Sequence, residues 1–171
     1  MRARAGRAAL ITTVVIAAAV TGCAGRRLQD GTYRSEHGYR VTVPGPGWAV
    51  VDESAADLEL RRADGQAGML ATATCGPLVR HRYTDLGRHL LLGLRERETL
   101  EDDEASLAGY KGAHLVVEGR MRESKQRVRI ESYTVKNERC VYDLLYVASP
   151  AVFDASRADF EQFVRSFTAD R

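Results

Sequence analysis

The sequence predicts an α+β fold in which a mostly antiparallel β-sheet is flanked by helices. Two observations lead to this prediction. Short stretches of alternating apolar and polar residues, typical of strands, outnumber helix-like patterns in the chain of 171 residues. Several of these stretches are joined by connections of hairpin length, which suit antiparallel neighbours, whereas parallel strands need long crossovers. The length indicates one domain, or one domain with an appendage.

The first half of the chain contains four strand patterns. Tyr39–Val43 alternates between apolar and polar residues, and a Pro-Gly-Pro-Gly stretch then separates it from Trp48–Val51. Leu58–Arg61 alternates in the same way. An Asp-Gly pair follows and predicts a turn into the strand Met69–Cys75, so these last two strands are expected to form a hairpin.

The second half contains three longer strand patterns, at Gly112–Met121, Gln126–Lys136 and Cys140–Ala148. The last of these is apolar at successive positions rather than at alternate ones. Such a strand is buried on both faces. We therefore expect Cys140–Ala148 to be a central strand of the sheet that is covered on both sides.

Two segments have helical periodicity. Asp85–Thr99 has leucines at four-residue spacing, although Gly87 and Gly93 weaken it. Ala155–Thr168 carries a stripe of phenylalanines. The acidic run Glu101–Glu104 lacks the spacing and the glycine of a calcium loop, and we interpret it as a solvated connection between a helix and a strand.

Residues 1–22 have the pattern of an export signal. Three arginines precede an apolar run, Ala8–Val20, that is too short to span a membrane. The following Val20-Thr21-Gly22-Cys23 resembles the lipobox of bacterial lipoproteins. This resemblance implies cleavage after Gly22, lipid attachment at Cys23, and residues 23–30 as a lipidated tether to the membrane. The alternative is an ordinary secretory signal with a chance cysteine.

Export also bears on the other two cysteines, Cys75 and Cys140. Disulfides persist in oxidising compartments outside the cytoplasm, and two cysteines remain once Cys23 carries lipid. We expect a bond between Cys75 and Cys140; the alternative is two separate buried thiols.

The sequence contains no catalytic motif, so we expect no catalytic residue, no metal site and no cofactor. The four histidines lack zinc-binding spacing, and His114 is interpreted as a packed or half-exposed strand residue. Residues 23–171 carry 22 basic and 23 acidic side chains, a balance that argues against nucleic acid as a partner. A basic stretch at 120–129 is expected to be the solvated tip of a hairpin; the alternative is contact with anionic lipid headgroups.

The order of these features resembles the PsbP-like proteins. The strand pattern that starts at Tyr39 ends at Pro44, and Trp48 follows four residues later. The segment Leu107–Ala113 then comes before three long strand patterns. A last helix closes with Phe163–Phe167. The resemblance covers about residues 33–168, and it implies a sheet between helices with an accessory or binding role.

We therefore expect a PsbP-like α+β domain over 31–171, acting as a non-catalytic interaction or assembly module of the cell envelope. Its partners would be the membrane, through Cys23, and an unknown envelope protein. If two membranes are present, Ala24 after the lipid-bearing cysteine resembles lipoproteins of the outer membrane. One alternative is a lipoprotein that binds a small apolar ligand between sheet and helix, and a further one is an envelope hydrolase.

Overall fold

The structure, a computed structural model, describes residues 27–170, which form two antiparallel sheets, two α-helices and a short 3-10 helix. The strands are β1 (Leu28–Gln29), β2 (Thr32–Arg34), β3 (Tyr39–Thr42), β4 (Trp48–Val50), β5 (Leu58–Arg62), β6 (Ala67–Cys75), β7 (Leu94–Leu107), β8 (Tyr110–Met121), β9 (Arg127–Lys136), β10 (Cys140–Ala148) and β11 (Thr168–Ala169). The helices are η2 (Pro77–Arg80), α1 (Tyr83–Leu90) and α2 (Phe153–Arg165). This architecture confirms the predicted fold class.

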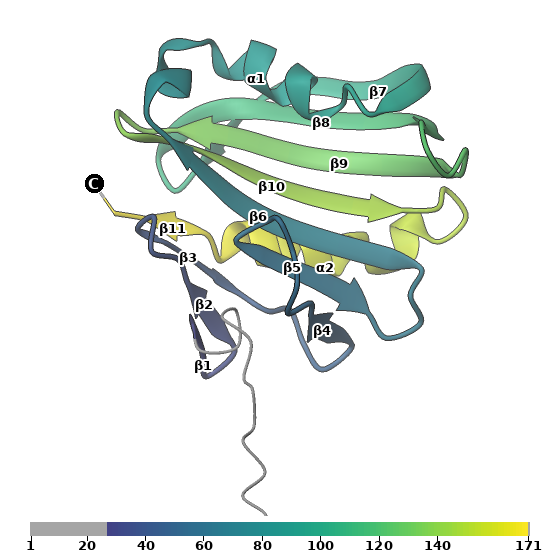
Figure 1. Ribbon diagram of the computed structural model, residues 1–171, viewed down its shortest axis with the longest axis horizontal. Helices are drawn as coiled ribbons and strands as arrows, with labels where there is room; N and C mark the ends of the chain where they lie inside the picture. The colour runs from purple at the N-terminus through teal and green to yellow at the C-terminus, as the bar shows by residue number, and fades with distance from the viewer. Residues whose placement is uncertain (1–26, 171) are drawn as a thin grey trace, which may run out of the picture.

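The larger sheet has seven strands in the order β4-β5-β6-β10-β9-β8-β7, and the smaller one has the order β1-β2-β3-β11 (Figure 1). β10 lies between β6 and β9, in the interior of the larger sheet, and nearly all of its residues are buried. The position of β10 agrees with its continuous apolar sequence, because a strand covered on both faces has no solvent-facing side.

The two α-helices cover opposite faces of the larger sheet. α1 packs on β8 and β9, and α2 packs on β10 and β6 (Figure 1). Neighbouring residues of β9 show the two faces: a Cβ on Gly87 of α1 would lie 3.4 Å from Thr134 Oγ1, whereas Tyr133 lies against Phe160 of α2, with ring centroids 6.1 Å apart. Successive side chains of a strand point to opposite faces. The sheet is therefore the middle layer of a sandwich.

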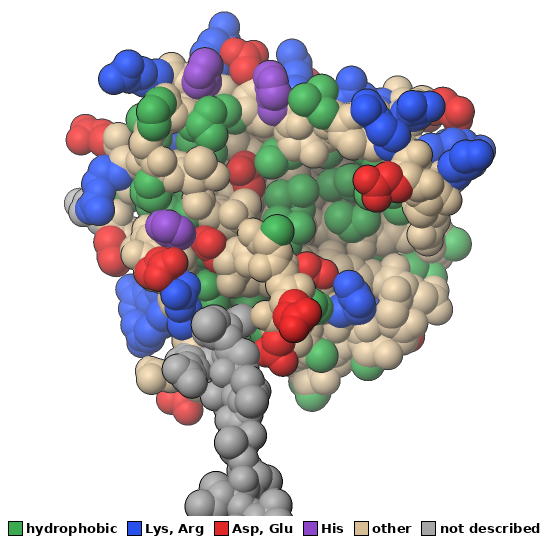
Figure 2. Space-filling view, viewed as in Figure 1, with side chains coloured by type: hydrophobic (Ala, Val, Ile, Leu, Met, Phe, Trp, Pro, Cys, Tyr) green, Lys and Arg blue, Asp and Glu red, His purple; other side chains and the backbone are tan. Residues whose placement is uncertain are grey.

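The main core lies between α2, the larger sheet and the smaller sheet, and it is rich in aromatic rings. Its largest fully buried side chains include Tyr33, Tyr39, Tyr142, Tyr146, Phe153, Phe160 and Phe163. A second, aliphatic core lies under α1 and includes Leu91, Leu94 and Leu115. Because α1 has only eight residues, hydrophobic side chains remain visible in a hollow of the sheet face beside it (Figure 2).

The helix predicted over Asp85–Thr99 is wrong in its second half. α1 ends at Leu90, and the chain from Leu94 onward forms the 14-residue edge strand β7. Leu91 and Leu94 are anchored in the aliphatic core, and the residues that follow gain ladder hydrogen bonds to β8. Most side chains of β7 are exposed, so the strand carries no apolar alternation in its sequence.

Gly112 in β8 is required where two strands lie very close together. A Cβ at this position would collide with the Thr134 carbonyl oxygen and with the Val135 side chain on β9. We expect Gly112→Ala to lower the free energy of unfolding by about 1–3 kcal/mol, measured by urea denaturation. The matched control is Gly68→Ala in β6, where the nearest atom, the Leu60 carbonyl oxygen, would lie 3.5 Å away. An equal loss in both variants would contradict this explanation.

Candidate functional site

The structure tests part of the cysteine assignment. Cys75 and Cys140 form a disulfide bond, as predicted, and the register of β6 and β10 places them directly opposite each other. Cys23 lies outside the described residues. Among the helices of residues 27–170, none is both long and apolar enough to cross a membrane.

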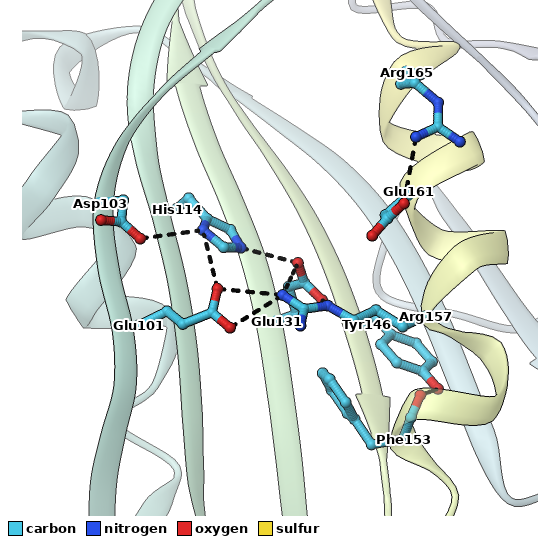
Figure 3. Close-up of polar contacts among 9 residues, drawn as sticks. All are labelled: Glu101, Asp103, His114, Glu131, Tyr146, Phe153, Arg157, Glu161 and Arg165. Atoms are coloured by element: carbon cyan, nitrogen blue, oxygen red, sulfur yellow. Dashed lines mark hydrogen bonds and ion pairs between the residues drawn. The ribbon is translucent and has the colours of Figure 1, made fainter.

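Charged side chains from three neighbouring strands and from α2 meet on one face of the larger sheet (Figure 3). They are Glu101 of β7, His114 of β8, Glu131 of β9 and Arg157 of α2; Asp103 lies at the rim. Asp103 pairs with His114 across β7 and β8, and Val116 pairs with Glu131 across β8 and β9. The strand register therefore brings residues from distant parts of the sequence to one place, which we call the ion-pair cluster.

Glu131 is the centre of the ion-pair cluster and is only 1 % exposed. One carboxylate oxygen lies 2.9 Å from His114 Nε2, and the other accepts a hydrogen bond of 2.9 Å from Arg157 Nε. Burial by itself would raise the pKa of Glu131, but the hydrogen bonds from His114 and Arg157 outweigh burial and hold the pKa below its ordinary value. Glu131 is thus a buried carboxylate with two partners.

Arg157 connects the ion-pair cluster to the edge of the sheet. Its Nη2 donates to both carboxylate oxygens of Glu101, at 3.2 and 3.3 Å. Its guanidinium carbon lies 5.9 Å from the centre of the Phe153 ring. Burial would lower the pKa of Arg157, but Glu131 and Glu101 raise it further above its ordinary value. The guanidinium is therefore a permanent positive charge that ties α2 to β7 and β9.

The acidic run Glu101–Glu104 lies within β7 and not in a connection as we expected, although three of its four side chains are exposed. Because its side chains alternate between the two faces, Glu101 and Asp103 point toward His114, whereas the other two acids face α1. Arg88 of α1 donates to Asp102 at 2.8 Å, and the Tyr83 hydroxyl donates to Glu104 at 2.8 Å. The run therefore binds elements on both faces of the sheet.

Glu101, Asp103 and His114 are the only residues within the described range whose potential ligand atoms gather closely enough for a metal ion, all lying within 4.8 Å of one another. Arg157 already neutralises the Glu101 carboxylate, and a metal ion there would be close to the guanidinium. Both ring nitrogens of His114 face carboxylates, and the ring stacks on Tyr133 with centroids 4.5 Å apart. We interpret the ion-pair cluster as a structural network that fixes α2 to the sheet.

The other sequence candidates lie elsewhere. His81 and His89 line a separate cavity beneath α1, and His37 lies beside Cys75. The basic stretch 120–129 spans the β8–β9 hairpin, as expected. Three of its arginines pair with glutamates: Arg127 and Arg129 with Glu118, and Arg120 with Glu96.

The sequence predicts His114 as a packed or half-exposed strand residue, but it did not predict that His114 pairs with Glu131 or that Glu131 pairs with Arg157. Glu131 lies 17 residues from His114, and Arg157 lies 26 residues from Glu131. No local signal marks Glu131, because in the sequence it shares its strand face with Arg127 and Arg129.

Neither a protein-family model nor a curated protein matches the sequence. Several solved structures are similar in fold, including the following three. The cyanobacterial PsbP, CyanoP, of Synechocystis sp. PCC 6803 matches with a TM-score of 0.60 and 15% identity over 91% of this chain and 99% of that one. LpqN of Mycobacterium tuberculosis, described as involved in cell envelope biogenesis, has a TM-score of 0.61 and 11% identity over 90% of this chain and 100% of that one. A Pseudomonas aeruginosa protein of unknown function has a TM-score of 0.53 and 10% identity over 82% of this chain and 96% of that one. At these identities the similarity establishes the fold, which is PsbP-like.

Proposed function

We propose that the protein is a lipid-anchored, non-catalytic interaction or assembly module on the extracytoplasmic side of the cell envelope. The proposal rests on one observation above all. A lipobox-like Val20–Cys23 precedes a PsbP-like domain whose first described strand begins at Leu28, only five residues after the cysteine. The proposed organisation is a signal peptide at 1–22, a lipidated tether at 23–30, whose last residues include strand β1, and the PsbP-like domain at 31–171.

The short tether sets the position of the domain. Five extended residues reach about 18 Å, so β1 would lie close to the bilayer surface. β1 and α1 lie at opposite ends of the molecule in Figure 1, so α1 would lie on the side away from the membrane, and the hollow beside it would remain uncovered. Hydrophobic side chains gather in this hollow (Figure 2), which supports a role in binding another component of the envelope.

The non-catalytic part of the proposal is supported by the charge state of the ion-pair cluster. Catalytic acids and bases need pKa values near the working pH. The pKa of Glu131 is lowered and that of Arg157 is raised, so both groups remain charged and paired at neutral pH.

The envelope location is supported by the similarity to LpqN. LpqN is described as involved in cell envelope biogenesis, and this chain has the same fold. In a cell with two membranes, we expect the protein at the periplasmic face of the outer membrane.

The anchor is tested by Cys23→Ala. We expect this variant to lose labelling by palmitate and to leave the membrane fraction of lysed cells, because two or three acyl chains are needed for stable attachment. Ala24→Ser, which leaves Val20–Cys23 intact, is the matched control and should retain both properties. Persistent membrane attachment of Cys23→Ala would contradict the anchor. Crosslinking in intact cells should then give envelope-protein adducts with the control variant that are lost in Cys23→Ala.

A further inference from the structure

A second buried carboxylate, Asp143, lies on the α1 face of the sheet. It occupies the middle of β10 and is 7 % exposed. Among the described residues its one hydrogen-bond partner is Thr134 of β9, whose Oγ1 donates to Oδ1 at 2.7 Å. Burial raises the pKa of Asp143 to about 6, although the Thr134 hydrogen bond lowers it in part. Asp143 is therefore ionised at neutral pH and, within residues 27–170, no basic side chain pairs with it.

The two buried acids of the central strands have different surroundings. Glu131 forms an ion pair with Arg157, which balances its charge, and it also lies 2.9 Å from His114 Nε2. A buried charge without such a partner is costly, and an isolated one calls for an explanation. The explanation for Asp143 lies in the cavity that it lines.

This cavity has a volume of about 370 Å³ and lies between α1, η2 and the sheet strands β6 and β10. Its walls are largely aliphatic and include Leu78, Leu86, Leu90 and Val141. Volumes of this order are typical of small-molecule sites, in which apolar walls surround a few polar groups. We call it the α1 pocket.

The polar groups that line the α1 pocket favour a ligand that donates hydrogen bonds. Asp143 and Asp85 offer carboxylate oxygens. His89 Nδ1 lies 3.1 Å from the Asp85 carbonyl oxygen, which can only accept, so Nδ1 carries a proton and Nε2 is the acceptor of the neutral ring. Lys136 lies on the same face of β9 as Thr134, but its ammonium is bound by the carbonyl oxygens of Val79 and His81, at 2.7 and 2.6 Å. Among the described residues, no lysine or arginine lines the α1 pocket.

We propose that the α1 pocket binds a small organic cation, an ammonium group carried on a compact apolar body, with Asp143 as its counter-charge. The apolar body would contact the leucines and Val141, and the ammonium group would donate to Asp143. The inference goes beyond the proposed anchor and assembly role and does not depend on either, because all lining residues lie within 74–143.

The probe is benzylamine, a cation at neutral pH, compared with its neutral analogue benzyl alcohol. Calorimetric titration of the full chain at pH 7.5 should show benzylamine binding at least tenfold more tightly than benzyl alcohol. Binding should weaken as the pH falls through about 6, where Asp143 gains a proton. The other ionisable groups facing the site are His81, Asp85, His89 and Lys136.

Asp143→Asn should reduce the affinity for benzylamine at least tenfold. The variant should fold at least as well as the wild type, because the amide keeps the bond from Thr134 and removes a buried charge; its thermal midpoint checks this. Asp154→Asn, an exposed acid at the start of α2, is the matched control and should bind as the wild type does. Leu78→Trp should also weaken binding by narrowing the pocket without touching Asp143. Equal affinity for amine and alcohol, or benzylamine binding that is unchanged in Asp143→Asn, would overturn the proposal.

Discussion

Removing the disulfide in the double variant Cys75→Ala/Cys140→Ala should lower the free energy of unfolding by about 4 kcal/mol. The two cysteines are 65 residues apart, and closing a loop of this length removes much of the conformational entropy of the unfolded chain. The bond also joins β6 to β10 at one end of their ladder, so the effect should be large. Urea denaturation of oxidised wild type and double variant measures the difference.

Chemical reduction provides an independent control for this prediction. Wild-type protein treated with dithiothreitol should lose about as much stability as the double variant loses, whereas the double variant should not respond to dithiothreitol. A denaturation midpoint that is the same for oxidised and reduced wild type would show that the bond contributes little.

The strands and helices that the sequence predicts well are those with a buried face. β6, β8, β9 and β10 all lie within the predicted ranges or differ at their ends by a few residues, because each contributes side chains to a core. β7 was not predicted, since it is an edge strand whose side chains are mostly exposed. Its glutamates and arginines favour a helix locally, and only the hydrogen bonds to β8 make it a strand.

The candidate sites were less predictable than the fold. Two cysteines remain once Cys23 is assigned to lipid, and compartments outside the cytoplasm are oxidising. These two facts were enough to predict the pairing of Cys75 with Cys140. The ion-pair cluster depends on strand order and register: Glu101, Glu131 and Arg157 meet only once β7, β8 and β9 are adjacent and α2 has packed on the sheet. Asp143 stands among apolar residues in the sequence, but nothing local indicates that a cavity opens in front of it.

Replacing Arg157 with methionine should lower the free energy of unfolding by about 3 kcal/mol at pH 7. Methionine preserves much of the apolar stem but leaves the buried Glu131 carboxylate with His114 as its remaining hydrogen-bond partner. Removing one member of a buried ion pair is costly because the other remains desolvated. The matched control is Arg165→Met on the same helix. Its ion pair with Glu161 is exposed, with Arg165 at 69 % and Glu161 at 48 % side-chain exposure, so we expect a loss within about 0.5 kcal/mol.

The pH dependence distinguishes this ion pair from simple packing. Because the folded protein holds the pKa of Glu131 below its ordinary value, the stabilisation by Arg157 is fully present above the unfolded pKa of about 4.3 and is lost as the pH falls through the folded pKa. In Arg157→Met the pKa of Glu131 should rise, since burial remains and the guanidinium is gone. The stability gap between wild type and Arg157→Met should therefore be widest near pH 7 and should narrow toward pH 3. A gap of constant size from pH 7 to pH 3 would assign the loss to packing of the Arg157 stem. Glu131→Leu combined with Arg157→Met should recover part of the stability, because the buried carboxylate that Arg157 neutralised is then removed as well.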